Sequence, residues 1–412
     1  MCRFKGILMN YERTRLFLEE RGQAHLLDYY EELTQDKRRQ LLEDIENTNF
    51  SIVKNLQVQA KKRGKLSPVT AVTIQDIKRR KTNFEAVGLE LLKEGKVAAV
   101  LLAGGQGSRL GFDKPKGMFN IGETRELSIF EQQMVNIREV TERTGRHFLL
   151  FIMTSVENHD ETVKFFEDHN CFGYPRDRVK FFIQDVAPTC DFEGKIFLSE
   201  KHRVSLAPNG NGGWYSSLVN SGLARVLERE NIEWLNVYSV DNVLQRICDP
   251  AFIGATVLKG YRCGAKVVKK VNADEKVGVL CQENGKPAIV EYYEMPENLK
   301  TKKKKGELVY RYGVTLNYLF NIHDLNLTLS GKLPYHLAEK AITHIENGEK
   351  VVPAEPCGYK FETLVVDMVA HMDSCLAYEV ERDVEFAPIK NATGCDSVES
   401  ARELLKKNGV IL

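Results

Sequence analysis

Short apolar runs and amphipathic stretches alternate along most of this chain. The clearest run is VAAVLL at 97–102, whose six consecutive apolar residues are typical of a parallel strand covered on both faces. Further strand-like runs are His147–Met153, Val179–Gln184, Trp234–Val240, Ala265–Lys270 and Val309–Phe320. Strands separated by helical stretches predict an α/β domain with a doubly wound, largely parallel mixed sheet. In such sheets, ligands bind beyond the carboxyl ends of the strands.

The first part of the chain has a helical pattern instead. From Tyr11 to about Ala60, apolar residues recur among charged ones, and Thr34 is suited to an N-cap. We therefore expect a helical N-terminal region over 1–90, a central domain over 91–384 and a short C-terminal segment over 385–412. The lysines of 302–305 predict an exposed hairpin tip.

Charge and cysteine usage narrow the class of protein. The 412 residues include 58 basic and 57 acidic ones, so the net charge is +1 and gives no sign of nucleic acid as a partner. Two basic clusters, 61–65 and 78–81, are interpreted as solvated faces. The nine cysteines are scattered without a C-x-x-C pair, and no apolar run is long enough to span a bilayer. We expect a cytoplasmic protein with free thiols and no membrane partner.

A glycine-rich loop with cationic residues follows the first strand. Gly104, Gly105 and Gly107 allow backbone N–H groups to converge on phosphate oxygens, and Arg109 and Lys116 add positive charge. The loop lacks the Gly-Lys-Ser/Thr ending of a P-loop, and its glycine spacing differs from G-x-G-x-x-G. The pattern favours a phosphate-binding loop outside those two classes, with a merely structural turn as the alternative.

The loop also resembles a family signature. LAGGQGSRLG, beginning at Leu102, and the KPKG that follows are similar to the signature of sugar-nucleotide pyrophosphorylases. The LAGGQG form resembles the eukaryotic UDP-N-acetylhexosamine pyrophosphorylases, whereas UDP-glucose pyrophosphorylases typically have asparagine in place of Ala103. The family usually has threonine at Ser108, and serine keeps the hydroxyl. The resemblance implies a Rossmann-like nucleotidyltransferase fold, in which Arg109 and Lys116 cover the triphosphate and the departing pyrophosphate.

A second candidate feature is the carboxylate at the end of another strand. Joining a sugar 1-phosphate to a nucleoside triphosphate requires charge neutralisation more than a strong base, because the sugar phosphate is already an anionic nucleophile. Asp241, in VYSVDN, would by itself be interpreted as a turn former. The segment resembles the family's VDN segment, whose aspartate lies at the metal and the nucleotide phosphates. Mg²⁺ is the implied cofactor, with Mn²⁺ as the alternative, since one carboxylate beside phosphate oxygens suffices for it.

A third feature is the turn in LAPNGNGGWY. It is similar to the family's P-D/N-G-N-G-G loop, which together with an upstream glutamine reads the uracil edge. The resemblance thus implies that Gln184, Gly210 and Asn211 bind the base of UTP. An amide side chain and loop backbone suit uracil, which presents a donor and acceptors.

Later segments resemble the family's sugar-binding elements. KVGV, IVEYYE and GVTLN imply sugar contacts by Gly278, Glu291 and Asn317 respectively. EFAPIKN matches the motif E-F-S/A-P-L/I-K-N, whose lysine, here Lys390, contacts the sugar-side phosphate and completes a positive clamp with the loop cations. Each residue by itself is typical of an ordinary strand or surface position.

Two departures from the family leave the specificity open. Where the family tends to have phenylalanines around the N-acetyl group, this chain has Leu364 and Val366, which form a wider apolar wall. Only Ala392–Leu412 follows the lysine motif, whereas many relatives carry a longer C-terminal domain, so a monomer is expected by default. The leading hypothesis is a uridylyltransferase that makes UDP-N-acetylglucosamine and pyrophosphate from UTP and N-acetylglucosamine 1-phosphate, or another N-acetylhexosamine 1-phosphate. The alternatives are a UDP-sugar or UDP-glucose pyrophosphorylase of broader specificity, and a non-catalytic sugar-nucleotide sensor.

Overall fold

The computed structural model describes residues 10–53, 56, 63–330 and 333–412, and the chain forms two compact units. The smaller unit is built from the described residues of 1–62, 185–212 and 334–364. The larger unit is built from those of 63–184, 213–333 and 365–412. The N-terminal helices therefore share a unit with two later segments. The sequence had suggested a division into consecutive ranges instead.

The smaller unit combines helices with short antiparallel strands around a core of its own. Its helices are α1 (Tyr11–Glu19) and α2 (Gln35–Asn47), whose buried leucines pack with residues of the later segments such as Ile196 and Phe361. Thr34 is the N-cap residue of α2, as predicted, although its side chain makes no capping hydrogen bond. The strands are β6 (Val186–Pro188), β7 (Cys190–Asp191), β8 (Leu198–Glu200), β9 (Arg203–Val204), β10 (Leu206–Pro208), β18 (His336–Lys340), β19 (His344–Glu346), β20 (Glu349–Val351) and β21 (Gly358–Glu362).

The larger unit is organised by a mixed sheet with the order β2-β22-β12-β17-β11-β3-β4-β5, to which β13, β14 and β1 are added. The pairs β3–β11, β3–β4 and β4–β5 are parallel, while β17 runs antiparallel to both neighbours. The strands are β1 (Leu66–Pro68), β2 (Ala71–Val72), β3 (Val97–Leu102), β4 (Leu150–Thr154), β5 (Val179–Ile183), β11 (Trp234–Ser239), β12 (Cys263–Lys269), β13 (Val279–Glu283), β14 (Lys286–Val290), β17 (Tyr312–Asn321) and β22 (Cys375–Glu379).

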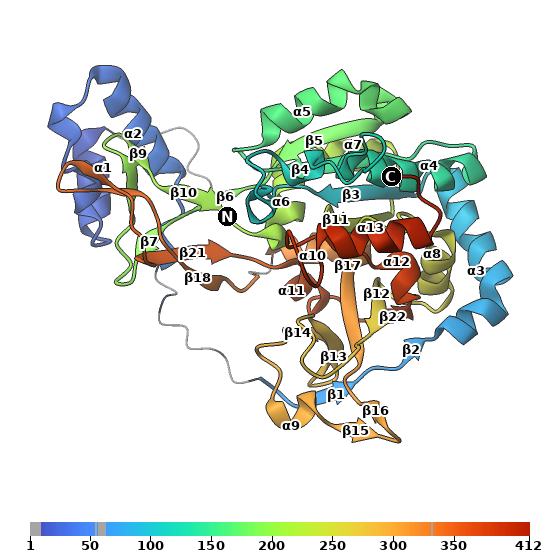
Figure 1. The fold of residues 1–412 in the computed structure, drawn as a ribbon. Helices are drawn as coiled ribbons and strands as arrows, with labels where there is room; N and C mark the ends of the chain where they lie inside the picture. The colour runs from blue at the N-terminus through green and yellow to red at the C-terminus, as the bar shows by residue number, and fades with distance from the viewer. Residues whose placement is uncertain (1–9, 54–55, 57–62, 331–332) are drawn as a thin grey trace. The chain divides into compact units, whose positions relative to one another are not determined.

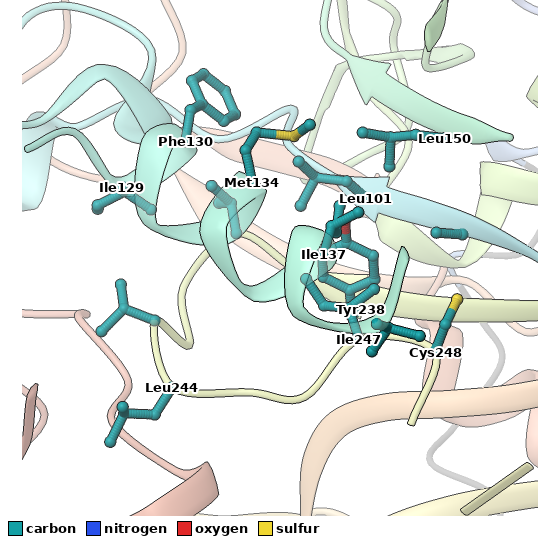
Figure 2. Close-up of a cluster of buried hydrophobic side chains, with 14 of the residues drawn as sticks. Leu101, Ile129, Phe130, Met134, Ile137, Leu150, Tyr238, Leu244, Ile247 and Cys248 are labelled. Carbon is teal, nitrogen blue, oxygen red and sulfur yellow. The ribbon is translucent and has the colours of Figure 1, made fainter. Parts of the chain in front are cut away.

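Helices cover both faces of this sheet, which confirms the doubly wound α/β prediction. Leu101 of β3 packs with Phe130 and Ile137 of α4 in one core cluster (Figure 2), and Val100 on the alternate face is fully buried as well. The helices of this unit are α3 (Ile74–Glu94), α4 (Ile129–Thr144), α5 (His159–Asp168), α6 (Trp214–Asn220), α7 (Ala224–Arg229), α8 (Pro250–Leu258), α9 (Glu297–Lys300), α10 (Ile322–Ser330), α11 (Val365–Val369), α12 (Arg382–Glu385) and α13 (Val398–Lys407).

Helices α3 and α8 lie side by side in backbone contact (Figure 1). A Cβ on Gly88 would overlap the carbonyl oxygen of Pro250, and one on Gly254 would overlap that of Phe84. Because each glycine faces the other helix, the two axes approach more closely than larger side chains allow. This contact fixes α3 and α8 against each other in the larger unit.

Several local predictions can be compared with the structure. The lysine-rich tip is confirmed as the hairpin of β15 (Lys303–Lys304) and β16 (Glu307–Leu308). The last part of the predicted N-terminal helical pattern, with Lys61 and Lys62 of the first basic cluster, lies outside the described residues. The eight cysteines that the structure describes are all free thiols, as expected. None of the described helices has the length and apolar character that a membrane crossing requires.

Candidate active site

The glycine-rich loop and Asp241 lie at neighbouring strand ends in the larger unit. Strands β3 and β11 pair in parallel with Leu102 opposite Ser239, and the backbone N–H of Val240 donates to the carbonyl of Leu102 at 3.2 Å. The loop that follows β3 and the carboxylate that follows β11 therefore leave the sheet at the same edge. This is the edge at which the parallel pattern predicts ligand binding.

The glycine-rich loop folds back on itself through backbone hydrogen bonds. The N–H of Gly107 donates to the carbonyl of Lys114 at 3.0 Å, and the N–H of Lys116 donates to that of Gly105 at 3.2 Å. Gly105 is exposed, with open space where a side chain would be, and Ser108 begins the short 3-10 helix η4 (Ser108–Leu110). The fold of the loop thus leaves N–H groups and its exposed face available to an anion.

Arg109 and Lys116 leave this loop in different environments. The guanidinium of Arg109 is exposed, and no hydrogen bond or ion pair engages it among the described residues. Lys116 instead begins η5 (Lys116–Met118), and its side chain is only 12% exposed. The loop therefore offers one solvated cation and one that is held in place.

Asn158 anchors the loop from below and was missed by the sequence reasoning. Its side-chain amide donates to the carbonyl of Ala103 at 3.0 Å and, more weakly, to that of Gly105 at 3.4 Å. Its amide oxygen accepts from the N–H of Ser155 at 2.8 Å, and the residue is fully buried. Asparagine in front of α5 has the appearance of an ordinary helix cap, so no separate sequence signal pointed to this role.

Gln184 lies against Gly104 of the glycine-rich loop. Gln184 directly follows β5 and is 6% exposed, and its N–H donates to the carbonyl of Thr154 at 2.8 Å. A Cβ on Gly104 would lie 2.6 Å from the side-chain oxygen of Gln184. An alanine at position 104 would therefore have to displace the side-chain amide of Gln184.

Lys116 and Asp241 join the two strand ends. The ammonium of Lys116 lies 2.5 Å from Oδ1 of Asp241, whose side chain is 32% exposed. The backbone N–H of Asp241 donates to the hydroxyl of Ser239 at 3.2 Å. Opposite charges predicted from separate motifs are thus in direct contact.

Asn242 connects the Asp241 loop to the segment that carries Lys390. Its amide N–H donates to the carbonyl of Glu385 at 2.7 Å, and its amide oxygen accepts from the N–H of Ala387 at 2.9 Å. The N–H of Ile389 then donates to the carbonyl of Asp241 at 2.9 Å. Lys390, the next residue, therefore begins directly beside Asp241. The sequence pointed to the VDN and EFAPIKN motifs separately but not to this contact between them.

Lys390 is half exposed and has a carboxylate partner of its own. Its ammonium lies 3.1 Å from Asp396, and its backbone N–H donates to the carbonyl of the same residue at 2.7 Å. The side chain is 39% exposed, so solvent screens this pair strongly. Such a pair can exchange for a phosphate without a large penalty.

Two of the three residues predicted to contact the sugar lie together. Gly278 precedes β13 and Glu291 follows β14, and these strands pair with Val279 opposite Val290. A Cβ on Gly278 would lie 3.3 Å from a carboxylate oxygen of Glu291 and 3.5 Å from the side chain of Val314. The structure thus adds Val314, which the sequence reasoning had not selected, to this group.

Asn317 lies in a different, buried polar layer. Its amide oxygen accepts from Asn236 at 2.8 Å, and its amide N–H groups donate to Gln245 at 3.4 Å and to the carbonyl of Arg246 at 3.3 Å. The preceding residue, Leu316, has a φ of 55°, at an irregularity in the pairing with β12. A role in sugar binding stays a prediction for Asn317, whose amide is occupied by protein groups in this structure.

The remaining predicted base-binding residues belong to the smaller unit, whereas Gln184 belongs to the larger one. Gly210 has a φ of 84°, and a Cβ there would overlap the carbonyl oxygen of Thr363. Asn211 begins the 3-10 helix η8 (Asn211–Gly213), and the N–H of Gly212 donates to the same carbonyl at 2.9 Å. The turn is thus built against the residue before Leu364. Val366 lies in α11 of the larger unit.

The fold and the strand-end site define a nucleotidyltransferase type of α/β protein, and comparisons with known proteins agree. The model of the UTP–glucose-1-phosphate uridylyltransferase family matches residues 43–410, and the chain belongs to this family. UDP-N-acetylhexosamine pyrophosphorylase-like protein 1 of Mus musculus is 35% identical, over 94% of this chain and 82% of the relative. The UDP-N-acetylglucosamine pyrophosphorylase of Saccharomyces cerevisiae is 32% identical, over 95% and 86%.

A solved structure supports the same assignment. The uridine diphosphate N-acetylglucosamine pyrophosphorylase of Trypanosoma brucei, crystallised in complex with an inhibitor, superimposes with a TM-score of 0.79 at 27% identity. The match covers 97% of this chain and 85% of that one. Both the resemblance stated from the motifs and the predicted fold class are thereby confirmed.

Proposed function

We propose that this protein is a uridylyltransferase that converts UTP and N-acetylglucosamine 1-phosphate to UDP-N-acetylglucosamine and pyrophosphate. The observation that carries the proposal is the meeting of the glycine-rich loop, Asp241 and the Lys390 segment at one sheet edge. The names of the relatives from Mus musculus and Saccharomyces cerevisiae support an N-acetylated sugar as substrate.

In the proposed reaction, a phosphate oxygen of the sugar 1-phosphate attacks the α-phosphorus of UTP in line. The new P–O bond forms as the bond between the α-phosphorus and its bridging oxygen to the β-phosphorus breaks, and pyrophosphate leaves with that electron pair. No proton has to be removed from the nucleophile, so catalysis depends on orientation and on neutralising the phosphates. We assign Arg109 and Lys116 to the triphosphate and the departing pyrophosphate, and Lys390 to the phosphate of the sugar.

The base and the sugar are assigned to the groups beside this centre. Gly104 is assigned to the phosphates as part of the glycine-rich loop, and Gln184 is assigned to the uracil. Contacts of Gly210 and Asn211 with the base stay predictions from the family motif. Gly278 and Glu291 bind the sugar hydroxyls, since a carboxylate accepts hydrogen bonds from hydroxyl groups. A contact between Asn317 and the sugar is also part of this proposal.

Asp241 suits a divalent cation that arrives with the nucleotide. It is a partly exposed carboxylate, and the described residues contain no group of three or more His, Cys, Asp or Glu side chains that would hold a metal without substrate. Mg²⁺, or Mn²⁺ in its place, accepts one carboxylate together with phosphate oxygens and water. When bound, the cation would neutralise phosphate charge, while Lys116 supplies a fixed positive charge beside the same carboxylate.

The first test measures pyrophosphate release from UTP and Mg²⁺ with N-acetylglucosamine 1-phosphate. N-Acetylgalactosamine, glucose and galactose 1-phosphates are assayed in parallel. We expect the highest turnover with N-acetylglucosamine 1-phosphate. Turnover with glucose 1-phosphate alone would assign the protein to the broader UDP-sugar class, and release from none of the four would favour the non-catalytic sensor.

We also propose that the enzyme is a cytoplasmic monomer. The free state of the eight described cysteines supports a reducing compartment. Sedimentation of the full chain tests the monomer, and a dimer at micromolar concentration would contradict it. Localisation of a tagged chain in intact cells tests the compartment.

A further inference from the structure

A lysine that the proposed reaction does not use is buried in the centre of the larger unit. Lys266 lies on β12, and its side chain is 1% exposed. Its ammonium lies 2.5 Å from Oε2 of Glu385, 3.0 Å from Oδ2 of Asp249 and 3.2 Å from the carbonyl oxygen of Arg246. Three acceptors therefore match the three N–H groups of the ammonium.

These partners mark the far ends of the two segments that carry site residues. Asp249 ends the stretch that begins at Asp241, and its Oδ1 also accepts from Ala251 at the start of α8. Glu385 begins the stretch that ends at Lys390. Each segment is thus held at one end by Lys266 and presents a charged site residue at the other end.

The hydrogen-bond network around Lys266 extends further to Asn317, Gln245 and Ser239. The carbonyl of Arg246, which accepts from Lys266, also accepts from the amide of Asn317. Asn317 contacts Gln245, and the amide of Gln245 donates to the carbonyl of Ser239 at 2.6 Å. The residues before and after Asp241 are therefore both connected to this buried layer.

Stability alone does not account for such an arrangement. Burying an ammonium and two carboxylates carries a large desolvation penalty, and well-packed apolar residues are often as stabilising. Apolar residues lack direction, whereas the three charged or dipolar contacts of Lys266, which join β12 to the two segments, permit only one register of those segments. The network is therefore better suited to holding positions than to adding free energy.

We propose that Lys266 is a positioning residue that sets Asp241 and Lys390 against each other through Asp249 and Glu385. This inference rests on the proposed function, because it assigns Lys266 to the alignment of residues that bind phosphate there. The groups joined are β12, the loop from Asp241 to Asp249 and the segment from Glu385 to Lys390.

The decisive variant is Lys266→Met combined with Glu385→Gln. Lys266, Glu385, Asp249 and Arg246 carry two positive and two negative charges, and the double variant keeps one of each, so the sum stays at zero. The single variant Lys266→Met leaves two buried carboxylates without the ammonium, and where it fails to fold the double variant carries the test. The control is Lys269→Met on the same strand, whose side chain is 49% exposed and lies 3.7 Å from its nearest carboxylates.

Turnover is measured at saturating UTP and sugar phosphate, with thermal unfolding and hydrogen exchange of residues 241–249 and 385–391. In the folded double variant we expect kcat to fall about 10- to 100-fold, because small misplacements of catalytic groups have effects of this size. The KM for UTP should stay within about twofold, because Gln184, which is assigned to the base, lies outside the two segments and should bind the ground state and the transition state equally. Exchange should rise in the two segments and stay unchanged in β3, and Lys269→Met should match the wild type.

A folded double variant with wild-type kcat and only a lower unfolding temperature would overturn the inference and leave a structural role. Equal losses for the Lys269→Met control would overturn it as well. The proposed function has a separate readout: an inactive wild-type chain refutes the function. In that case, hydrogen exchange measured in residues 241–249 and 385–391 still decides whether Lys266 holds the two segments together.

Discussion

The two sides of the candidate site are held by different kinds of group. The loop side, residues 103–116, is fixed by backbone hydrogen bonds and by the neutral amide of Asn158. The clamp side, residues 241–249 and 385–390, is fixed by the buried charges around Lys266 and by Asn242. A loop that receives polyphosphate through N–H groups benefits from neutral anchors, because a buried carboxylate beneath it would weaken its positive potential. The clamp side presents a carboxylate, Asp241, and an ammonium group, Lys390, so the positions of these two groups relative to each other have to be fixed instead.

Lys116→Ala removes the contact between the two sides and should have the largest effect. Lys116 is the loop cation that meets Asp241, and deleting a group that stabilises charge in the transition state typically costs about 10²- to 10³-fold in kcat. Steady-state turnover with UTP and N-acetylglucosamine 1-phosphate checks this loss. The control is Lys164→Ala, an exposed lysine of α5 paired with Asp168, which should keep wild-type turnover. Turnover of Lys116→Ala near that of the control would remove this lysine from the catalytic group.

Gly104→Ala tests whether the loop side depends on the space above Gly104. The added methyl group would collide with the Gln184 amide, so kcat/KM for UTP should fall about 10- to 100-fold, mainly through KM. The double variant Gly104→Ala with Gln184→Ala should lose little more than Gln184→Ala alone, since contacting residues are non-additive. Fully additive losses would show that the two residues act independently.

Asn158→Ala tests the neutral anchor itself. The variant leaves buried backbone groups of Ala103 and Ser155 without a partner, at about 1–3 kcal/mol for each group. We expect a lower unfolding free energy and a roughly tenfold lower kcat/KM for UTP, because the loop to which we assign phosphate binding is no longer fixed. The surface variant Asn47→Ala serves as the control, since that exposed side chain caps only its own helix. Normal kinetics with lowered stability would limit Asn158 to a structural role.

The smallest expected effect is on the pH dependence of the unfolding free energy. It concerns a carboxylate of the clamp side, whereas the loop side is held by neutral groups. Burial tends to raise the pKa of Asp249, but the attraction of Lys266 outweighs it, and the pKa lies below its usual value. The native state thus holds this carboxylate charged more firmly than the unfolded chain does. The stability that it contributes is present above the usual aspartate pKa of about 4 and is lost as pH falls toward the native value.

Urea unfolding between pH 7 and pH 3 measures this contribution. The decline in unfolding free energy on acidification should be smaller in Asp249→Asn than in the wild type, and Asn158→Ala should keep the wild-type decline. An identical decline in the Asp249 variant would show that this carboxylate titrates alike in both states.

The sequence predicted the parts of the site that follow directly from local pattern. The run at 97–102 indicated β3, and parallel pairing with β11 placed the glycine-rich loop beside Asp241. The family motifs selected Gln184 and Lys390, and the structure brings the first against Gly104 and the second beside Asp241. Motifs at strand ends were informative because the sheet itself determines where such ends meet.

Residues that act through long-range contacts had no such signal. Lys266 stands in a strand pattern, and its partners are 17 and 119 positions away along the chain. Asn317 was selected by its motif. It follows Leu316, which has a left-handed backbone, and its side-chain amide is hydrogen-bonded to the amide of Asn236. A β-bulge changes which face a side chain occupies, and sequence spacing alone does not locate bulges.

The full use of Lys266 by three acceptors has a consequence for substitutions that preserve charge. A guanidinium would bring five N–H donors in a rigid plane to a dry space that offers acceptors for an ammonium with three. Arginine at this position would therefore be more damaging than a paired neutral exchange with Glu385. The two positions are therefore coupled in stability, and an unpaired change at either one should lower the free energy of unfolding more than the paired change does.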